Sequence, residues 1–335
     1  MLRDRRLIFI LASVASSFLL IGLWLAFDLT VGLALLVLGV VLLAFSAEKA
    51  VEHSVNVASA LKVSPLMIGL IIVSLGTDFP EIVNSIISSA FGHGDINVGD
   101  SFGSILAQMT LVLGLLALIG GRFKVKREEI TVMGACEVLA LIAAVSTVEK
   151  GHISWINAVF LVASWPLFML ITRNVMKKPA ETSHTGQKPA YHLILAILGF
   201  IGVAVGSYIA ITSVIALSAV LNVPEYLLSF FVVAIGTSLP ELVVDLTAVR
   251  KKQYEIAIGD AIGSSIIDAG FSIGIGPLIF GKIAVSGRLA ETTGLYALLC
   301  SIVVISILAL REKLDAKVGV LFIVLYFLAY ATPYI

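Results

Sequence analysis

The sequence predicts an all-α polytopic membrane protein, and three observations support this fold class. First, 59% of the 335 residues are hydrophobic and only 13% are charged, whereas soluble domains average about 25% charged residues. Second, the chain contains a series of apolar runs, each long enough to cross a bilayer. Third, it contains an internal duplication. Membrane lipid is therefore the expected surrounding, and the net charge of zero argues against a nucleic-acid partner.

The apolar runs predict eleven spans, because a helix needs about 20 apolar residues to cross the hydrocarbon core. The first run follows Arg3, Arg5 and Arg6, as a signal peptide would. It is long for a signal peptide, however, and no small-residue cleavage site follows at the right place. We therefore expect 1–28 to be a retained transmembrane segment or signal anchor. In chain order, the predicted spans are 7–27, 30–47, 65–90, 98–119, 130–148, 153–172, 191–220, 225–248, 256–280, 288–310 and 316–334.

Lysine and arginine residues predict the orientation, since cytoplasmic loops carry an excess of both. If the N-terminal arginines are cytoplasmic, the outside loops hold little beyond Lys150, Lys282 and Arg288. We expect a multi-pass protein of the plasma membrane with its N-terminus in the cytoplasm. The predicted inside loops, which hold most of the remaining lysine and arginine, are 48–64, 120–129, 173–190, 249–255 and 311–317.

The loop 173–190 has the composition of a cytoplasmic linker and divides the chain into two halves, 29–172 and 191–335. Each half contains one copy of a repeat, at 61–114 and at 221–274. Chance matches between apolar runs are common, but matched glycine, proline and carboxylate positions are not. The most informative matches are Gly76/Gly236, Thr77/Thr237, Pro80/Pro240, Glu81/Glu241, Gly99/Gly259, Asp100/Asp260, Gly103/Gly263 and Ser104/Ser264.

The two copies should have opposite orientations in the membrane. The loop inside the first copy, 91–97, lacks lysine and arginine, whereas the equivalent loop of the second copy carries Arg250, Lys251 and Lys252. An odd number of spans, five, separates equivalent helices. Inverted repeats with a binding site at their interface are a recurring transporter architecture, because the halves can exchange conformations and so change which side is open.

Glu81 and Glu241 are the strongest candidate site residues. A carboxylate at membrane depth is costly and is retained mainly where it binds a ligand or faces water. Thr77 and Glu81 are four residues apart, as are their repeat equivalents, so each pair lies on one helix face. The prolines at 80 and 240 also free the carbonyl groups four residues earlier, at Gly76 and Gly236, for use as ligands.

A second polar stripe occurs in the span that follows each glutamate. Its members recur every four residues, which places them on one face of each helix. The pooled ligands of both stripes are carboxylate, hydroxyl, amide and carbonyl oxygens, which suit hard cations such as Ca²⁺, Mg²⁺ and Na⁺. No lysine or arginine lies at the same depth to receive an anion. The two stripes are Asp100, Ser104 and Gln108, and Asp260, Ser264 and Asp268.

Simpler roles exist for several of these residues. The hydroxyls of Thr77, Ser104, Thr237 and Ser264 could bond to their own helices or bridge neighbouring helices. Asp100 and Asp260 follow glycine near predicted helix starts, where aspartate is a natural cap, so a capping or gating role is expected for both. We expect Glu137 and Glu291 to be interfacial, the five histidines to be solvated, and Cys136 and Cys300 to be inert buried thiols.

These motifs resemble the cation/Ca²⁺ exchanger superfamily, on its sodium/calcium exchanger branch of prokaryotic type. The family carries two copies of Gly-Thr-Ser-x-Pro-Glu, each followed by Gly-x-x-Gly-Ser-x-x-x-Asn/Asp. The second repeat matches the first motif with 236–241 and the last six positions of the second motif with 263–268, and the first repeat is similar over 76–81 and 103–108. The resemblance covers about 30–334, and paired motifs in both repeats make it specific.

The resemblance implies ten core transmembrane helices in two inverted five-helix repeats, plus the extra N-terminal helix. It implies an antiporter that exchanges Na⁺ for Ca²⁺ by alternating access, with no organic cofactor, enzymatic activity or obligate protein partner. Glu81 and Glu241 would hold Ca²⁺ with the carbonyls of Thr77 and Thr237, and Gln108 and Asp268 would line the centre. Flanking Na⁺ sites would use Ser104, Ser264 and the carbonyls near Ser74 and Ala234. Asp78 and Ser238, at the third motif position, complete the candidate ligands.

Two departures from the family pattern leave the coupling ion open. Asp78 replaces the motif's serine and adds a carboxylate, and Gln108 is longer than the usual asparagine. A H⁺-coupled or K⁺-dependent exchanger is therefore the main alternative, and a passive cation channel is a weaker one. An intramembrane aspartyl protease is disfavoured, because Gly99-Asp100 and Gly259-Asp260 lack the first glycine of the Gly-x-Gly-Asp signature.

Overall fold

The computed structural model describes residues 29–46, 48–50, 52–53, 74–175, 189–250, 252 and 254–334, and nearly all of them are helical. Within this part of the chain, seven helices are long and apolar enough to span a membrane. Two shorter apolar helices, Trp155–Ile171 and Ala316–Ala331, accompany them. A mostly helical, multi-pass membrane protein is thereby confirmed. The predicted span 7–27 lies outside the described residues.

The helices follow the predicted spans closely from 98–119 onward, with ends shifted by a few residues. The predicted linker 173–190 is shorter than expected, because α8 continues through Val175 and α9 begins at Pro189; residues 176–188 lie outside the described part. The elements of the first half are α3 (Ser74–Thr77), α4 (Phe79–Ala90), α5 (Gly94–Leu106), η2 (Ala107–Val112), α6 (Leu113–Gly120), β1 (Phe123–Lys124), α7 (Arg127–Val148), β2 (His152–Ile153) and α8 (Trp155–Val175).

The second half repeats this order of elements at a nearly constant distance along the chain. For example, α4 and α12 both contain 12 residues, and both begin one residue after a helix break. The elements are α9 (Pro189–Leu221), α10 (Glu225–Leu228), η3 (Ser229–Val233), α11 (Ala234–Thr237), α12 (Leu239–Arg250), α13 (Tyr254–Ile267), η4 (Asp268–Ser272), α14 (Ile273–Phe280), β3 (Ile283–Ala284), α15 (Gly287–Arg311), β4 (Lys313–Leu314), α16 (Ala316–Leu328) and η5 (Ala329–Tyr334).

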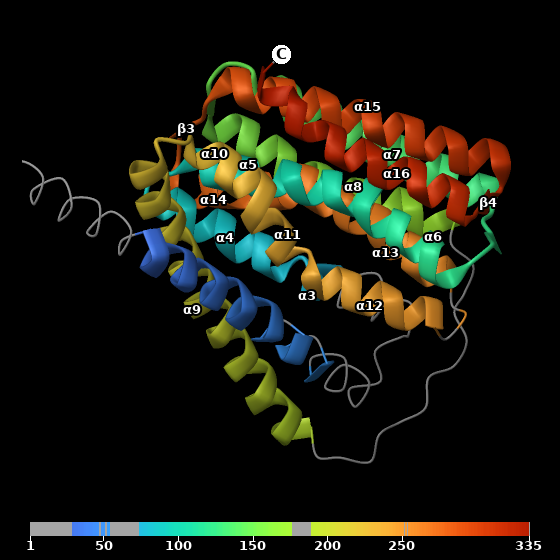
Figure 1. Ribbon diagram of the computed structural model, residues 1–335, viewed down its shortest axis with the longest axis horizontal. Helices are drawn as coiled ribbons and strands as arrows, with labels where there is room; N and C mark the ends of the chain where they lie inside the picture. The colour runs from blue at the N-terminus through green and yellow to red at the C-terminus, as the bar shows by residue number, and fades with distance from the viewer. Residues whose placement is uncertain are drawn as a thin grey trace, which may run out of the picture.

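Two short antiparallel ribbons show how the equivalent helices α7 and α15 run relative to one another. Strand β1, before α7, pairs with β4, which follows α15. Strand β2, after α7, pairs with β3, which precedes α15. The start of each helix therefore lies beside the end of the other. Because α7 and α15 also pack along each other, as Figure 1 shows, these equivalent helices are antiparallel neighbours.

A separate pair of helices, the span Leu29–Ala50 and α9, packs beside the rest of the molecule (Figure 1). Small residues bring the pair together: a Cβ on Gly206 would lie 2.7 Å from the backbone nitrogen of Leu43, a close approach typical of membrane helices. The pair meets α4 through a small apolar cluster of Leu43, Val83 and Val203, which is distinct from the main core.

Large apolar side chains cover the outer surface of several helices, as lipid contact requires. Ile194 and Ile201 on α9 are more than half exposed, as are Leu299 and Leu310 on α15. Polar side chains are instead concentrated inside the helix bundle, where they build the site described next.

Candidate cation site

In each copy of the repeated Gly-Thr-x-x-Pro-Glu motif, the helix is broken at the residue before Phe79 or Leu239. Asp78 has φ −74° and ψ 2° between α3 and α4, and Ser238 has φ −83° and ψ 7° between α11 and α12. Proline follows as the second residue of the next helix in both copies. Because proline has no backbone N–H, the helix cannot continue its hydrogen bonding through this point. The break exposes backbone groups and directs Asp78, Glu81 and Glu241 inward.

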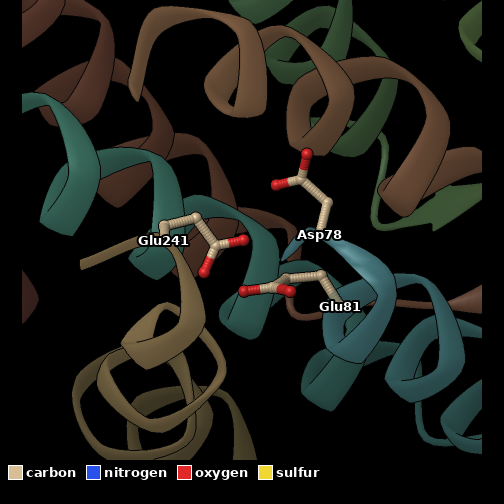
Figure 2. A group of neighbouring side chains, drawn as sticks. All are labelled: Asp78, Glu81 and Glu241. Atoms are coloured by element: carbon tan, nitrogen blue, oxygen red, sulfur yellow. The ribbon is translucent and has the colours of Figure 1, made fainter. Parts of the chain in front are cut away.

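The three carboxyl groups of Asp78, Glu81 and Glu241 meet inside the bundle. One oxygen of each lies within 4.8 Å of an oxygen of the other two, and Figure 2 shows the three side chains pointing toward one another. All three residues are buried, with at most 1% of their surface exposed. The predicted meeting of Glu81 and Glu241 from the two halves is therefore present in the structure, and Asp78 joins them.

The protein provides little compensation for this concentration of negative charge. The Oδ atoms of Asp78 and the Oε atoms of Glu241 accept no hydrogen bond, and Glu81 accepts one, from Ser104 Oγ at 3.3 Å. No lysine or arginine of the described chain has a buried side chain. An unpaired buried carboxylate is very costly, whereas clustered carboxylate oxygens are ligands for hard cations. The arrangement therefore suits a cation.

Next to these carboxylates, Ser104 in the first half of the chain contacts residues of the second half. Its hydroxyl lies 3.2 Å from Thr237 Oγ1 and 3.4 Å from the Ala234 carbonyl oxygen. The resemblance lists both Ser104 and the carbonyl near Ala234 among the ligands of the flanking cation sites, without pairing them, and in the structure the two are in contact. Oxygen atoms of Ser104, Ala234 and Glu81 thus form a second group next to the central one.

Gly103 permits this approach, since α5 lies directly against η3 and α11. A Cβ at Gly103 would lie 2.2 Å from the Phe230 carbonyl oxygen and 2.6 Å from the Ala234 Cβ. We predict that Gly103→Ala lowers the free energy of unfolding by about 1–3 kcal/mol, the usual cost of overpacking. The melting temperature in detergent measures this effect. Leu299→Val, on the exposed face of α15, is the control; equal melting temperatures for both variants would contradict the prediction.

Gln108 and Asp268 face each other from equivalent π-helical segments, η2 and η4. Gln108 Nε2 donates to Asp268 Oδ2 at 3.3 Å, and Gln108 Oε1 accepts from Ser265 Oγ at 3.0 Å. Both residues are fully buried. Single π-helical turns inside α-helices occur often at functional sites. The sequence analysis expected both residues to line the centre but did not predict their hydrogen bond, in which the amide donates to the carboxylate.

The candidate ligands named above that remain to be placed are Ser264, Thr77, Ser238 and Ser74. Ser264 is buried, and its hydroxyl forms no hydrogen bond. Thr77 and Ser238 are buried near the helix breaks, and the Ser238 hydroxyl also has no hydrogen-bond partner. Ser74 begins α3, but its side chain lies outside the described part. The two halves thus present the same residues in unequal surroundings.

The expectation that Asp100 and Asp260 cap helices is wrong. Helix α5 begins at Gly94, with His93 at the N-cap position. Asp100 therefore lies inside the helix, where it accepts hydrogen bonds from Asn84 Nδ2 and, at 2.9 Å, Thr237 Oγ1. Asp260 likewise lies inside α13 and is 7% exposed. The sequence analysis placed the starts of both helices too late in the chain. Asp100 and Asp260 therefore appeared to lie at helix ends, although both lie inside their helices.

Other expectations have mixed outcomes. Glu137 is not interfacial: it is buried between α7 and α15 and accepts a hydrogen bond from Ser301 Oγ at 2.6 Å. Glu291 is exposed, in line with an interfacial position. His192 is 5% exposed rather than solvated, and its Nδ1 lies 2.9 Å from that of His53. Cys136 and Cys300 are buried free thiols, as expected.

Two polar residues of this region were missed by the sequence analysis. Asn84 donates to Asp100, and Asp245 is fully buried on α12. Asp245 follows Glu241 by four residues, so the same spacing that linked Thr77 to Glu81 could have identified it. Asn84 carries no such signal, because it lies three residues after Glu81 and has no polar equivalent in the second repeat.

Comparisons with known proteins find related membrane proteins. The chain is 28% identical over 306 residues to the uncharacterized membrane protein MJ0091 of Methanocaldococcus jannaschii, covering 91% of this chain and 98% of that protein. It is 30% identical to the inner membrane protein YrbG of Escherichia coli, covering 73% and 79%.

A solved structure of the sodium-calcium exchanger NCX_Mj, soaked with 10 mM Na⁺ and no Ca²⁺, superposes with a TM-score of 0.64 at 27% identity, covering 91% of this chain and 99% of that one. The family model described as "Sodium/calcium exchanger protein" matches residues 31–173 and 191–334. Since this match covers most of the chain, the protein belongs to the sodium/calcium exchanger family.

Proposed function

We propose that this exchanger is a secondary active antiporter that exchanges Na⁺ for Ca²⁺ by alternating access. The observation that carries the proposal is the meeting of Asp78, Glu81 and Glu241 within 4.8 Å. Glu81 and Glu241 occupy equivalent positions in the two halves of the chain, Asp78 adds a third carboxylate from the first half, and the described residues supply no buried lysine or arginine side chain. All-oxygen coordination of this kind suits Ca²⁺ and Na⁺.

Ion coupling follows from the charge of the site. Carboxylates cannot remain charged and unpaired in a closed, water-free cavity, so the empty site resists closure. One Ca²⁺ or several Na⁺ ions can neutralise it and permit the transition. Because both ions need the same carboxylate oxygens, they compete and do not load together. Each transition in one direction then carries Ca²⁺, and the return carries Na⁺.

The architecture supports alternating access. We infer that 29–172 and 191–335 form two inverted five-helix repeats, since α7 and α15 are equivalent and antiparallel. The pair formed by Leu29–Ala50 and α9 meets the rest through small clusters, separate from the main core. We infer that this pair slides against the remaining helices to open each side in turn. The loop charges place the N-terminus in the cytoplasm, and the plasma membrane is the proposed location.

Flux measurements in proteoliposomes test the proposal. Purified protein is reconstituted, loaded with Na⁺ and diluted into Na⁺-free buffer with radioactive Ca²⁺. The Na⁺ gradient is expected to drive Ca²⁺ uptake, and replacing internal Na⁺ with choline should abolish uptake. Ca²⁺ uptake that is indifferent to the Na⁺ gradient would reject sodium coupling.

A K⁺-dependent or H⁺-coupled exchanger is the second candidate, and Asp78 is the observation that favours it. Its carboxylate replaces the serine of the family motif and accepts no hydrogen bond, so it offers a place for one more cation. Repeating the flux measurement with K⁺ or a pH gradient in place of Na⁺ separates the candidates. Under the primary proposal, neither drives uptake.

Ca²⁺ is expected to stabilise the purified protein. A ligand that binds only the folded state at 100 times its dissociation constant adds about 2.7 kcal/mol to the free energy of unfolding. The melting temperature in detergent should therefore rise with added Ca²⁺ in Na⁺-free buffer and fall back after chelation. Glu241→Gln should show a much smaller shift. An equal shift in this variant would mean that Ca²⁺ acts elsewhere.

A further inference from the structure

We propose that Asp100 is a positioning residue, which orients the hydroxyl group of Thr237 so that its oxygen can bind a monovalent cation. The cation would lie at the flanking group, the oxygens of Ser104, Ala234 and Glu81 described above. The choice of Na⁺ as this cation rests on the proposed exchange function. The role of Asp100 rests on the hydrogen bonds that join α4, α5 and α11.

Both carboxylate oxygens of Asp100 accept a hydrogen bond inside the helix bundle. Thr237 Oγ1 donates to Oδ1 at 2.9 Å, and Asn84 Nδ2 donates to Oδ2. Asp100 and Asn84 are 1% exposed and Thr237 is 0% exposed, so these bonds are shielded from bulk water. Because Asn84 on α4 holds one oxygen of the carboxylate, the other oxygen stays directed at Thr237 on α11.

Thr237 has several acceptors within reach but only one hydroxyl proton. Besides Asp100, the carbonyl oxygens of Val233 and Ala234 lie 3.3 and 3.2 Å from Thr237 Oγ1. The carboxylate is the nearest acceptor, and a hydrogen bond to a charged acceptor is about twice as strong as one to a neutral acceptor. The proton therefore goes to Asp100, and the Ala234 carbonyl oxygen keeps its lone pairs for a cation.

The contact between Thr237 and Ser104 then contains no proton. Ser104 Oγ lies 3.2 Å from Thr237 Oγ1 and 3.3 Å from Glu81 Oε1. The Ser104 proton goes to the Glu81 carboxylate for the same reason that the Thr237 proton goes to Asp100. The two hydroxyl oxygens thus turn lone pairs toward each other, which is unfavourable in a buried place unless a positive charge lies beside them.

Three neutral oxygen atoms are therefore free to bind one ion. Thr237 Oγ1 lies 3.2 Å from Ser104 Oγ and 3.2 Å from the Ala234 carbonyl oxygen, and these last two are 3.4 Å apart. Oxygens that bind one hard cation at about 2.3–2.6 Å and at right angles are about 3.3–3.7 Å apart, so the triangle is close to the spacing of a cation's ligands. With Glu81 as the one charged neighbour in the group, the ligands suit a monovalent ion.

Na⁺ binding without transport tests this role. The full-length protein in detergent and without Ca²⁺ is titrated with Na⁺, choline keeps the ionic strength constant, and the rise in melting temperature gives the half-saturating Na⁺ concentration. Asp100→Leu, which has no acceptor, should raise this concentration about tenfold or more, because Thr237 then donates to the Ala234 carbonyl. Asp100→Asn keeps an acceptor for Thr237, and Asn84 can turn to accept from the new amide through its unpartnered Oδ1. This variant should raise the concentration less than about threefold, and the control Glu137→Gln should not change it.

A double substitution separates positioning from a general structural effect. Thr237→Val removes the hydroxyl group and preserves the shape of the side chain. If Asp100 acts through Thr237, adding Asp100→Leu to Thr237→Val should change the half-saturating Na⁺ concentration less than about twofold, whereas two independent effects would multiply.

The proposal is overturned if Na⁺ does not stabilise the wild-type protein, or if Asp100→Leu leaves the half-saturating Na⁺ concentration unchanged. It is also overturned if Asp100→Asn raises that concentration as much as leucine does, because charge and not position would then matter, or if the effects at 100 and 237 multiply. Asp100→Ala, which also lacks an acceptor, replaces the leucine variant if that variant does not fold. Because no gradient is used, a loss of Na⁺-driven Ca²⁺ flux with intact Na⁺ binding would reject the exchange function and leave this role standing.

Discussion

Glu81→Gln is expected to abolish Ca²⁺ transport, reducing Ca²⁺ flux in proteoliposomes by about 100-fold or more. Glutamine preserves the size of the side chain but removes its negative charge. One Glu81 oxygen lies within 4.8 Å of oxygens from both Asp78 and Glu241, and Ser104 donates to Oε1. Loss of one charged ligand from a buried charge pair costs about 2–5 kcal/mol, and about 2.7 kcal/mol corresponds to 100-fold in affinity.

Glu137→Gln is the matched control for this experiment. Both glutamates are buried, both accept one hydrogen bond from a serine, and each has an Oε2 atom without a partner. Glu137 differs by its position between α7 and α15, away from the central carboxylates. Its substitution should leave flux near the wild-type level. Equal loss of flux in the two variants would mean that buried charge in general, and not the central group, supports transport.

The helical architecture could be predicted well because lipid imposes simple constraints on the chain. Backbone groups in the hydrocarbon core must be satisfied internally, so apolar length alone located the spans from 98–119 onward. The helix starts could not be placed equally well. Gly94 and Asp95 look like loop residues, yet α5 already begins there, and this error assigned capping to Asp100. The two ribbons that join the halves contain only two residues per strand, too few to leave a pattern.

The central site could be predicted because proline, glutamate and the repeat made Glu81 and Glu241 stand out against apolar sequence. Spacing along one helix identifies which residues share a face, but it does not show which face meets another helix. For this reason neither the contacts of Ser104 with Ala234 and Thr237 nor the contact of Asn84 with Asp100 was predicted. The burial of Glu137 depends likewise on Ser301, which is 164 residues away.

Asp78→Ser is expected to preserve transport but to raise the Ca²⁺ concentration for half-maximal uptake about tenfold or more. Glu81 and Glu241 remain in this variant, so the central group still has two carboxylates. A serine fits the backbone, because Ser238 has nearly the same conformation at the equivalent break, with φ −83° and ψ 7° against −74° and 2°. Loss of one carboxylate removes a ligand and a negative charge, and about 1.4 kcal/mol accounts for a tenfold change.

The same substitution changes the charge that crosses the membrane per Ca²⁺, and the exchange current measures this change. With Asp78 present, three neighbouring carboxylates must be balanced before the site closes; with serine, two remain. The Na⁺-loaded site should then need two monovalent cations in place of three, so exchange for one Ca²⁺ moves no net charge, and the exchange current is lost while Na⁺-driven Ca²⁺ uptake continues. Lower Ca²⁺ affinity with a persisting exchange current would show that Asp78 binds Ca²⁺ without setting the stoichiometry. Unchanged affinity would remove Asp78 from the site, because a carboxylate that shares a Ca²⁺ ion with Glu81 and Glu241 cannot be lost without weakening its binding.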